Sequence, residues 1–414
     1  MFDKPSYKIK WYYQLVVQLV IAVFKRVFKI TATIPSEIRD INEPYLLLSN
    51  HVGRYDPFIV SDFIRKKPNF ISSDAILRDS IIGRIFKGLG AIPKKKGVRD
   101  THVIREMVKV IQQGGAIALF PEATRTWSGE NLYIDPSIAK LVRLLKVPVI
   151  IAKMKGAYAF DPRWARPLRR AKVEIDYSFA ITKQQLASLE DDQIMNIIYK
   201  SLAHDDIAYL RENKVLIKSN CKAEYIERIL FQCPECKSFE GFSSTRNHFG
   251  CNICGYHLEV DNYGFFKKNG HSVPLDNPKD WLDWQNKNFV NWVSDNLKNT
   301  AESFLFKAVD MNIQVAEGQG KMIDKGLGYI AFYSDRIKIV SQKGEEDLLH
   351  SETTSLSPQF KERIEILYHD KAYRFTSIQY QEAGIKWELA INAVWYATGQ
   401  QFKLSPYFKH LFEE

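Results

Sequence analysis

The 414-residue chain exceeds one ordinary domain, so we expect two or three domains with substantial hydrophobic cores. Its net charge of +10 predicts anionic partners, and charge alone does not choose among lipid headgroups, phosphorylated substrates and nucleic acid. Five cysteines are too few for the disulfide framework of a secreted protein of this length, which favours a reducing compartment, the cytosol.

Residues 1–35 contain one apolar stretch, residues 11–24. It is shorter than the about 20 apolar residues that a bilayer core requires, so we expect a helix that lies in the membrane interface. Trp11, Tyr12 and Tyr13 would then lie at the level of the headgroups. The alternatives are a buried core helix, a signal sequence and a true span. Basic residues flank the stretch: Lys8, Lys10, Lys25, Arg26 and Lys29.

Residues 36–225 have the pattern of an α/β domain, in which short apolar runs alternate with segments of helical periodicity. The expected strands are residues 45–48, 69–72, 116–120, 147–152 and 172–179. The expected helices are residues 57–65, 77–88, 101–113 and 136–145, followed by one or two amphipathic helices over residues 186–210.

His51 and Asp56 directly follow the expected strand 45–48. A loop that leaves a rigid strand can hold an imidazole against a carboxylate, which lets the histidine act as a general base in a fixed tautomer. His271 and Asp276 repeat the spacing, but they lie in a polar stretch rich in Gly, Pro and Asn. The alternative for the first pair is a hydrogen bond that only stabilises the loop.

A second loop of polar residues, 120–126, follows the expected strand 116–120. Arg125 offers the planar guanidinium that matches phosphate oxygens, and Glu122 can orient a cation or a substrate hydroxyl. A solvated loop with a structural ion pair is the alternative. Further along, a basic cluster could contact anionic headgroups or be an ordinary solvated turn; it comprises Arg163, Arg166, Arg169, Arg170 and Lys172.

With these loops the chain resembles the glycerolipid acyltransferases, specifically the 1-acylglycerol-3-phosphate acyltransferase group. The resemblance covers roughly residues 10–205, and its four blocks occur in the family's order at residues 50–56, 90–96, 120–126 and 147–149. Lys96 stands where the family usually has arginine, Ala123 replaces a glycine and Thr126 replaces a serine. Lys96 lacks bidentate geometry, which leaves the identity of the acceptor open. Ala123 implies that this loop position needs no glycine-only conformation.

The resemblance implies a membrane-associated O-acyltransferase that makes phosphatidic acid. It would transfer a fatty-acyl group from acyl-CoA or acyl-carrier protein to the hydroxyl of lysophosphatidic acid, without an acyl-enzyme. His51 would be the general base, Asp56 would orient it, and Gly53 would keep the loop tight. The acceptor phosphate would be held by Lys96, Glu122 and Arg125. The alternatives are another lysophospholipid or hydroxyl acceptor, and a non-catalytic membrane adaptor. The expected location is the cytoplasmic face of a membrane, with its anionic surface as a partner.

Residues 226–270 are expected to form a zinc ribbon. Two Cys-x-x-Cys pairs, Cys233 with Cys236 and Cys251 with Cys254, supply four thiolates for a tetrahedral Zn²⁺ site. The protein would fill every ligand position, so the zinc would be structural and no redox cofactor is expected. A redox pair and a nucleic-acid-binding ribbon are the alternatives, and nucleic acid is disfavoured because no base-stacking motif accompanies the ribbon.

The remaining chain is expected to hold a helical linker and a mainly-β domain. Residues 271–310 contain the aromatic segment of the linker, and residues 311–414 contain short alternating strands before a helix over residues 383–396. This order resembles the barrel of pleckstrin-homology (PH) or GRAM-like domains.

Overall fold

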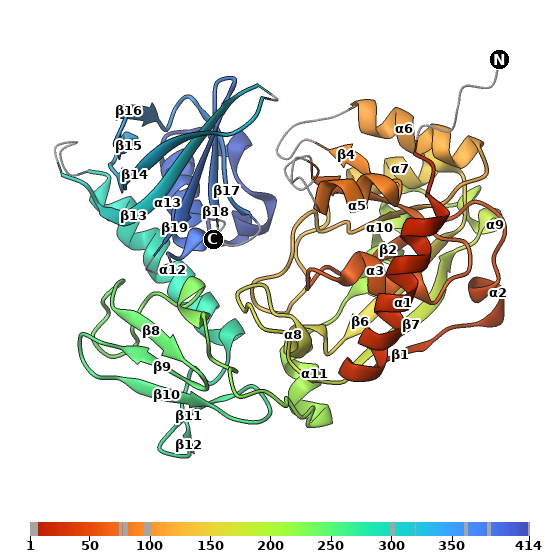
Figure 1. The fold of residues 1–414 in the computed structure, drawn as a ribbon, viewed down its shortest axis with the longest axis horizontal. Helices are drawn as coiled ribbons and strands as arrows, with labels where there is room; N and C mark the ends of the chain where they lie inside the picture. The colour runs from red at the N-terminus through yellow and green to blue at the C-terminus, as the bar shows by residue number, and fades with distance from the viewer. Residues whose placement is uncertain are drawn as a thin grey trace. The chain divides into compact units, whose positions relative to one another are not determined.

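The computed structural model of the chain describes residues 7–73, 77, 82–94, 101–298, 303–318, 320–359, 363–378 and 382–412 (Figure 1). The chain divides into two compact units. The N-terminal unit comprises residues 1–163, 167–219 and 262–264, and the C-terminal unit comprises residues 164–166, 220–261 and 265–414.

A seven-stranded sheet forms the centre of the N-terminal unit. Its strands, in order across the sheet, are β1 (Ile30–Thr33), β7 (Val173–Ile181), β6 (Val149–Lys155), β2 (Leu46–Ser49), β5 (Ile117–Leu119), β3 (Asn69–Ser73) and β4 (Ile92–Lys94). Neighbouring strands are parallel except β6 and β7. The predicted α/β class is confirmed for this unit. Strands β1 and β4 were not expected, and β1 lies within residues 1–35, the segment expected to be helical.

Helices cover both faces of this sheet. They are α1 (Trp11–Phe28), α2 (Ser36–Arg39), α3 (Asp56–Asp62), α5 (Ile82–Gly88), α6 (Thr101–Gln112), α7 (Ser137–Leu145), α8 (Ala157–Phe160), α9 (Lys183–Leu186), α10 (Asp191–Leu202) and α11 (Asp206–Asn213). Apolar side chains of α6, α7 and α10 form a core with Leu46, Leu48 and Ile151 of the sheet. On the opposite face the Tyr177 hydroxyl donates to the Val60 carbonyl of α3 at 2.6 Å.

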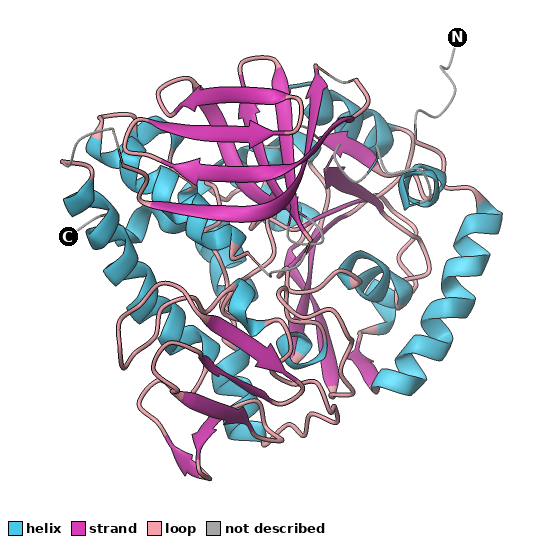
Figure 2. Ribbon diagram, turned by 60° about the vertical axis from the view of Figure 1, so that its left-hand side comes forward, coloured by secondary structure: helices cyan, strands magenta, loops and turns pink. Residues whose placement is uncertain are grey.

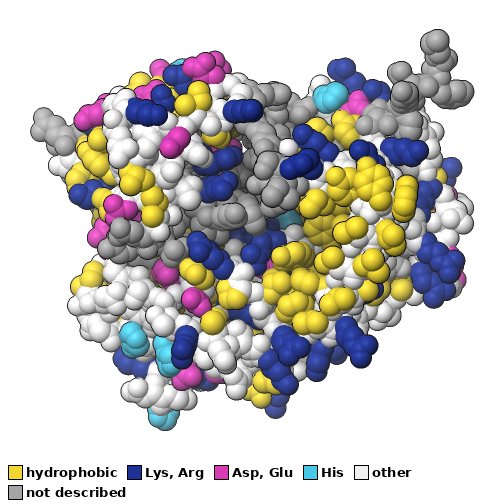
Figure 3. Space-filling model, viewed as in Figure 1, with side chains coloured by type: hydrophobic (Ala, Val, Ile, Leu, Met, Phe, Trp, Pro, Cys, Tyr) yellow, Lys and Arg dark blue, Asp and Glu magenta, His cyan; other side chains and the backbone are white. Residues whose placement is uncertain are grey.

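Helix α1 is four residues longer than the apolar stretch that predicted it. It has 18 residues and a mean hydropathy of 1.2, enough to cross a membrane by length and composition alone. Ile21 is its buried residue. Its exposed large apolar side chains are Trp11, Tyr12, Leu15, Val16, Leu19, Val20, Val23 and Val27. Figure 3 shows hydrophobic side chains gathered over this helix, with lysines and arginines at the edge of the patch.

The C-terminal unit begins with a five-stranded antiparallel sheet. Its strands are β8 (Phe242–Thr245), β9 (His248–Cys251), β10 (His257–Val260), β11 (Phe266–Lys268) and β12 (His271–Ser272), preceded by the short helix η1 (Ile226–Arg228). Helix α12 (Pro278–Asn296) packs on this sheet through Trp281, which is buried against Phe249 and Phe266. The Trp281 indole N–H donates to the Gln232 carbonyl at 3.1 Å.

A second antiparallel sheet completes this unit (Figure 2). Its seven strands, in order across the sheet, are β16 (Gly344–Leu349), β15 (Arg336–Ser341), β14 (Ile323–Phe332), β13 (Phe306–Glu317), β19 (Lys371–Ser377), β18 (Arg363–Tyr368) and β17 (Thr353–Gln359). Helix α13 (Gly384–Ala397) packs against β17 and β18, with its residues 384–395 buried. Two short turns, η3 (Gln401–Lys403) and η4 (Pro406–Leu411), follow it. The sheet-rich C-terminal half agrees with the expected mainly-β segment.

Candidate active site and four-cysteine site

Strands β2, β5 and β6 place the candidate catalytic loops at one edge of the sheet. The three strands are neighbours and parallel, so their carboxyl ends lie side by side. His51 follows β2, and the loop of residues 120–126 follows β5. Ligands of open α/β sheets bind outside the carboxyl ends of the strands, so this edge is where a substrate site is expected.

His51 and Asp56 form a hydrogen-bonded pair. The distance between His51 Nδ1 and Asp56 Oδ2 is 2.8 Å. Asp56 is 2% exposed, and Oδ2 also accepts the backbone N–H groups of Val52 at 2.7 Å and Gly53 at 2.9 Å. A carboxylate that already accepts these hydrogen bonds favours the tautomer in which Nδ1 carries the proton. The Nε2 atom of His51 is then unprotonated and can accept a proton from a substrate.

The surroundings of His51 favour the neutral imidazole. Burial lowers the pKa of His51 below its ordinary 6.5, against the opposing effect of Asp56, and the nearby charges of Arg125 and Arg163 lower it further. The imidazole ring stacks on Phe120 with the ring centroids 4.1 Å apart. A neutral histidine is the form that acts as a base.

Asn50 and Arg54 anchor the two sides of this loop. The Asn50 amide group donates to the Met154 carbonyl at 2.9 Å and accepts the Met154 N–H at 2.8 Å, which joins the loop to β6. Arg54 binds the fully buried Asp161 through Nε at 3.1 Å and Nη2 at 2.6 Å. Sequence reasoning missed Asp161, because its distance along the chain from Arg54 follows no spacing rule.

Gly53 lies where a side chain would collide with Asp161. A Cβ atom at this position would be 2.7 Å from Asp161 Oδ2, closer than real Cβ contacts. The resemblance implied that Gly53 keeps the loop tight, and the contact gives a physical reason for glycine at this position. The Gly53 N–H also donates to Asp56. Gly53 therefore lets the loop approach Asp161 while its backbone N–H helps to orient the Asp56 carboxylate.

Glu122 is held within its own loop. Its side chain is 3% exposed, Oε1 accepts the Asn131 amide at 2.8 Å, and Oε2 accepts the Leu132 N–H at 3.1 Å. Burial raises the pKa of Glu122 to about 8, against the opposing effect of these donors. The carboxyl group therefore secures the loop, and Asn131 is a partner that sequence reasoning missed.

Ala123 occupies a conformation that is not restricted to glycine but that glycine adopts more readily. Its φ angle is +59°, in the left-handed region that favours glycine. An L-residue in this region costs about 1–2 kcal/mol. The family's glycine thus matches the backbone conformation, which the surrounding loop contacts impose on alanine here. One such contact is the hydrogen bond from the Thr124 N–H to the Glu122 carbonyl at 2.7 Å.

Arg163 supports the loop that carries Arg125. Its guanidinium Nη1 donates to the Arg125 carbonyl at 2.7 Å and to the Thr124 hydroxyl at 3.2 Å, and the group stacks 3.3 Å from the Trp127 ring centroid. The Thr126 N–H donates to the His51 carbonyl at 2.9 Å, which joins the two catalytic loops. Arg125 itself is half-buried.

The basic cluster of residues 163–172 is not one exposed strip. Arg163 and Arg169 are buried, at 6% and 4% exposed, whereas Arg166, Arg170 and Lys172 are exposed. Neither expectation, an exposed strip that meets headgroups or an ordinary solvated turn, fits Arg163 and Arg169, whereas both stay open for the three exposed residues. Arg163 has backbone and ring partners, and Arg169 is buried within the fold. Charge alone could not distinguish these two buried side chains from the three exposed ones.

A family model described as Acyltransferase matches residues 29–154. The match includes both candidate catalytic loops, and Asp161 and Arg163, which support these loops, lie beyond it. The chain is an O-acyltransferase. This confirms the predicted class of enzyme and the acyltransferase domain in the N-terminal half.

One similar solved structure is the 1-acyl-sn-glycerophosphate (LPA) acyltransferase PlsC from Thermotoga maritima. It aligns with a TM-score of 0.40 and 17% sequence identity, over 49% of this chain and 81% of that chain.

The block of residues 90–96 ends with three lysines, Lys94, Lys95 and Lys96. Lys96 lies outside the described residues, as does Lys95. Lys94 ends β4 and is exposed. Strand β4 is parallel to β3, so its carboxyl end at Lys94 lies at the same edge of the sheet as the candidate catalytic loops.

The second histidine and aspartate pair has a different setting. His271 is exposed on β12 in the C-terminal unit, and the Asp276 carbonyl accepts the Phe266 N–H at 2.6 Å. The preceding buried strand therefore distinguished the hydrogen-bonded pair, His51 with Asp56, from the pair with equal spacing.

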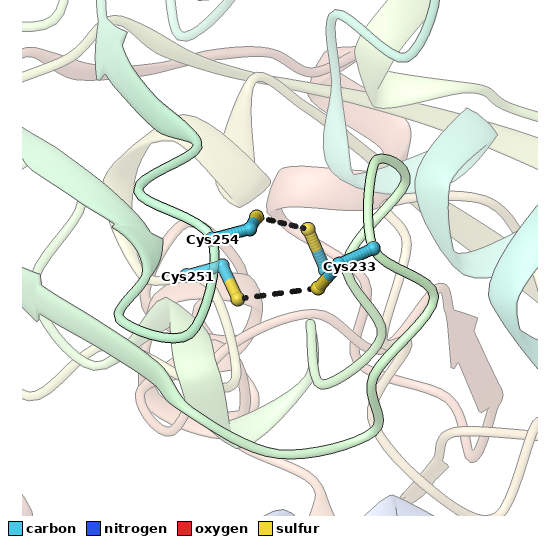
Figure 4. Close-up of side chains that lie close together, drawn as sticks. Cys233, Cys251 and Cys254 are labelled. Carbon is cyan, nitrogen blue, oxygen red and sulfur yellow. Dashed lines mark hydrogen bonds between the residues drawn. The ribbon is translucent and has the colours of Figure 1, made fainter.

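Four cysteines of the C-terminal unit lie together (Figure 4). The four Sγ atoms lie within 4.8 Å of one another, with Cys233 3.6 Å from Cys254 and Cys236 3.8 Å from Cys251. Four sulfurs bound at about 2.3 Å around a tetrahedral Zn²⁺ would be about 3.8 Å apart. The donor set and its spacing therefore fit a zinc ion.

Backbone amides support both halves of this four-cysteine site in the same way. The N–H groups of Glu235 and Cys236 hydrogen-bond to Cys233 Sγ, and those of Ile253 and Cys254 hydrogen-bond to Cys251 Sγ. Burial raises the pKa of Cys233 and Cys251, and these donors oppose that effect in favour of the thiolates, which are the form that binds metal.

Proposed function

We propose that the chain transfers a fatty-acyl group from acyl-CoA or acyl-carrier protein to the hydroxyl of lysophosphatidic acid, forming phosphatidic acid. The observation that carries this proposal is the His51–Asp56 pair, in which Asp56 occupies Nδ1 and leaves Nε2 for the acceptor hydroxyl. The loop of Arg125 lies at the same sheet edge. A basic side chain beside a general base suits a phosphate-bearing alcohol.

The proposed reaction is one direct transfer. His51 Nε2 removes the hydroxyl proton while the acceptor oxygen attacks the thioester carbonyl, and a tetrahedral intermediate forms. When this intermediate collapses, the carbon–sulfur bond breaks and the thiolate takes the proton from the His51 imidazolium. Asp56 stabilises the imidazolium and holds the ring orientation.

The acceptor phosphate is proposed to bind Arg125 together with Lys96 and Glu122. Arg125 can form two parallel hydrogen bonds to phosphate oxygens. Glu122 contributes by holding the loop through Asn131 and Leu132. Arg163 fixes the backbone of Arg125 and is a positioning residue for the same phosphate site.

An apolar route for the acyl chain starts at the catalytic histidine. Phe120 stacks on His51, and Phe70 stacks on Phe120 with the ring centroids 5.9 Å apart. Phe70 also lines an apolar groove of about 60 Å³ between α1, α3 and α5, together with Phe58 and Phe86. The groove is small, so it fits only the part of the chain nearest the thioester.

Helix α1 is proposed to dock the enzyme on the cytoplasmic face of a membrane. One side of the helix packs on the protein, where Phe24 contacts Tyr55 and Phe160 with ring centroids 4.9 and 5.5 Å apart. The other side exposes the apolar side chains shown in Figure 3. A helix with these two sides suits the interface better than a transmembrane path, and its flanking lysines suit anionic headgroups.

The C-terminal unit is proposed to contain a structural zinc ribbon and a PH/GRAM-like domain. Cys233, Cys236, Cys251 and Cys254 would hold the Zn²⁺, which would crosslink the two cysteine pairs. The seven antiparallel strands and the buried helix α13 support the second assignment.

The test compares wild-type protein with His51→Ala on a panel of acceptors. Each protein is supplied with acyl-CoA and with lysophosphatidic acid, other lysophospholipids or glycerol 3-phosphate. We expect His51→Ala to lose about 10² to 10⁴ in rate, because a positioned general base contributes that factor. His271→Ala is the matched control and should retain full activity.

Three outcomes would contradict the proposal. Equal activity of His51→Ala and wild type would exclude the mechanism. Turnover of glycerol 3-phosphate alone would exclude a lysolipid acceptor. Preference for another lysophospholipid would favour that acceptor over lysophosphatidic acid, the alternative that Lys96 raises.

A further inference from the structure

A polar cavity of about 390 Å³ lies at the carboxyl end of β6. Lys153 and Lys155 are two residues apart on β6, so both side chains project from the same face of the sheet. Lys153 is paired with Asp176 on the neighbouring strand β7, and Ile151 is paired with Ser178. The polar lining of the cavity comprises Lys153, Lys155, Asp176, Ser178, Ser201 and His204.

The two lysines of the cavity differ in their partners. Lys155 forms an ion pair with Asp176, with Nζ 2.5 Å from Oδ2. Within the described part of the chain, Lys153 donates no hydrogen bond and forms no ion pair. Burial lowers the pKa of Lys153, and Lys155 lowers it further. A partly buried ammonium group without an acceptor is suited to an anionic ligand.

Hydroxyl and imidazole groups add further ligand-binding capacity. Ser178 and Ser201 offer O–H donors. His204 Nε2 is 2.8 Å from Asp206 Oδ1, so Nδ1 is the ring nitrogen left for a ligand. The Asp176 carboxylate and the negative end of the α10 dipole are unfavourable for a bound anion. Removing the charge of Asp176 should therefore strengthen anion binding, whereas removing the charge of Lys153 should weaken it.

Hydrogen bonds connect the walls of the cavity to the loops of the proposed active site. The Asn50 side chain, next to His51, binds the backbone of Met154, the residue between the two lysines. On the other side of the cavity, the His204 N–H donates to Asn131 Oδ1 at 2.5 Å, and Asn131 binds Glu122. One wall is therefore joined to the His51 loop through Met154, and the other is joined to the Glu122 loop through two successive hydrogen bonds.

The cavity lies on the sheet face opposite the membrane helix. Asp176 and Ser178 line the cavity, and Tyr177 between them projects to the other face, where it binds α3. Helix α1 packs against α3. A membrane-held lysolipid would approach on the α1 side, whereas a water-soluble donor would approach from the cavity side.

We propose that this cavity binds phosphate groups of the acyl donor, which are the phosphates of coenzyme A or the phosphodiester of a carrier protein's pantetheine arm. The acyl chain then extends toward Phe120 and Phe70, and the thioester lies at His51. The cavity volume lies within the range of small-molecule sites. This assignment rests on the proposed acyl transfer.

The test measures the KM for acyl-CoA in Lys153→Ala and Lys153→Gln. A hydrogen bond to a charged group accounts for about a tenfold effect, so we expect KM to rise about tenfold with kcat nearly unchanged. The KM for an acyl thioester of N-acetylcysteamine, which has no phosphate, should not change. Asp176→Asn should lower the KM for acyl-CoA, and Lys140→Ala, an exposed lysine on α7, is the control.

An unchanged KM for acyl-CoA in both Lys153 variants would overturn the proposal. So would an equal rise with the phosphate-free thioester, or a rise confined to the KM for lysolipid, which would assign the cavity to the acceptor. Calorimetric binding of coenzyme A to the same variants needs no turnover. It therefore separates failure of this assignment from failure of the proposed reaction, because weaker binding to Lys153→Ala supports the site even if no acceptor is acylated.

Discussion

At the scale of single residues, His51 derives its chemical character from a few contacts. Asp56 holds Nδ1, Phe120 covers the ring, and Arg125 and Arg163 place positive charge nearby. Burial and these charges favour the neutral imidazole. Asp56 opposes them, because a carboxylate stabilises the imidazolium, which is the form that the proposed mechanism requires after proton transfer. The balance leaves a base that is ready at neutral pH.

The pH dependence of acyl transfer should reflect that balance. The active form of His51 is unprotonated, and its pKa is lowered from 6.5, so the rate should fall only as pH decreases through a value below 6.5. Arg163→Gln removes a charge that lowers this pKa, so its acid limb should lie at higher pH. Profiles of kcat/KM against pH measure the acid limb of the wild type and that of Arg163→Gln.

The acceptor phosphate also titrates, but its effect on the pH profile is the same for every variant. A difference between two profiles therefore comes from the enzyme. Arg166→Gln, a change at an exposed arginine, should leave the acid limb in place. A limb at the same pH in Arg163→Gln and wild type would show that Arg163 only supports the loop and does not tune the base.

At the scale of elements, α1 combines a packed side and an apolar exposed side. Lys10 donates its N–H to the Gly88 carbonyl at 2.9 Å, and the helix contacts α3 and β1. The exposed side would be unfavourable in water, and it is the kind of apolar patch that marks an interaction site. A membrane interface removes this surface from water without unpacking the other side of the helix.

Leu19→Glu should weaken binding to vesicles that contain anionic lipid. Leu19 is 62% exposed, and replacing a membrane-inserted leucine by a charged residue costs at least its burial energy of about 1.5–3 kcal/mol, a tenfold or larger loss. Sedimentation with vesicles gives the bound fraction. Leu144→Glu on α7, where the leucine is 51% exposed, is the control and should bind as wild type. Equal binding of Leu19→Glu would exclude α1 as the docking element.

At the scale of the whole molecule, the chain has two compact units with separate hydrophobic cores. In the C-terminal unit, Trp281 packs among aromatic residues close to the two cysteine pairs in the sequence. A metal that joins these pairs would stabilise this unit directly, since structural zinc contributes folding energy. The N-terminal unit has a core of its own that includes none of the four cysteines.

Removal of the metal should therefore lower the unfolding temperature of the C-terminal unit and leave the transition of the N-terminal unit in place. Calorimetry with and without a strong chelator, combined with metal analysis, measures this effect. Cys233→Ser should reproduce the loss, whereas Cys221→Ser, outside the four-cysteine site, should not. Full thermal stability and no bound zinc in wild type would contradict a structural metal.

The sequence by itself determined the features that depend on short-range pattern. Apolar runs predicted most strands of the first sheet within a few residues, because burial imposes a local periodicity on each strand. The preceding buried strand distinguished His51 and Asp56 from His271 and Asp276. Paired cysteines predicted their own cluster, since metal-ligand spacing is a local property.

Only the tertiary structure decided the features that join distant segments. Arg54 and Asp161 are far apart in the chain, and strand pairing brings them together without any spacing rule. The same is true of Arg163, whose charge suggested an exposed turn until its contacts with the Arg125 loop were known. The left-handed backbone of Ala123 follows from loop contacts that outweigh the residue's own preference. The lysine cavity depends on the register of β6 against β7, which no local pattern specifies.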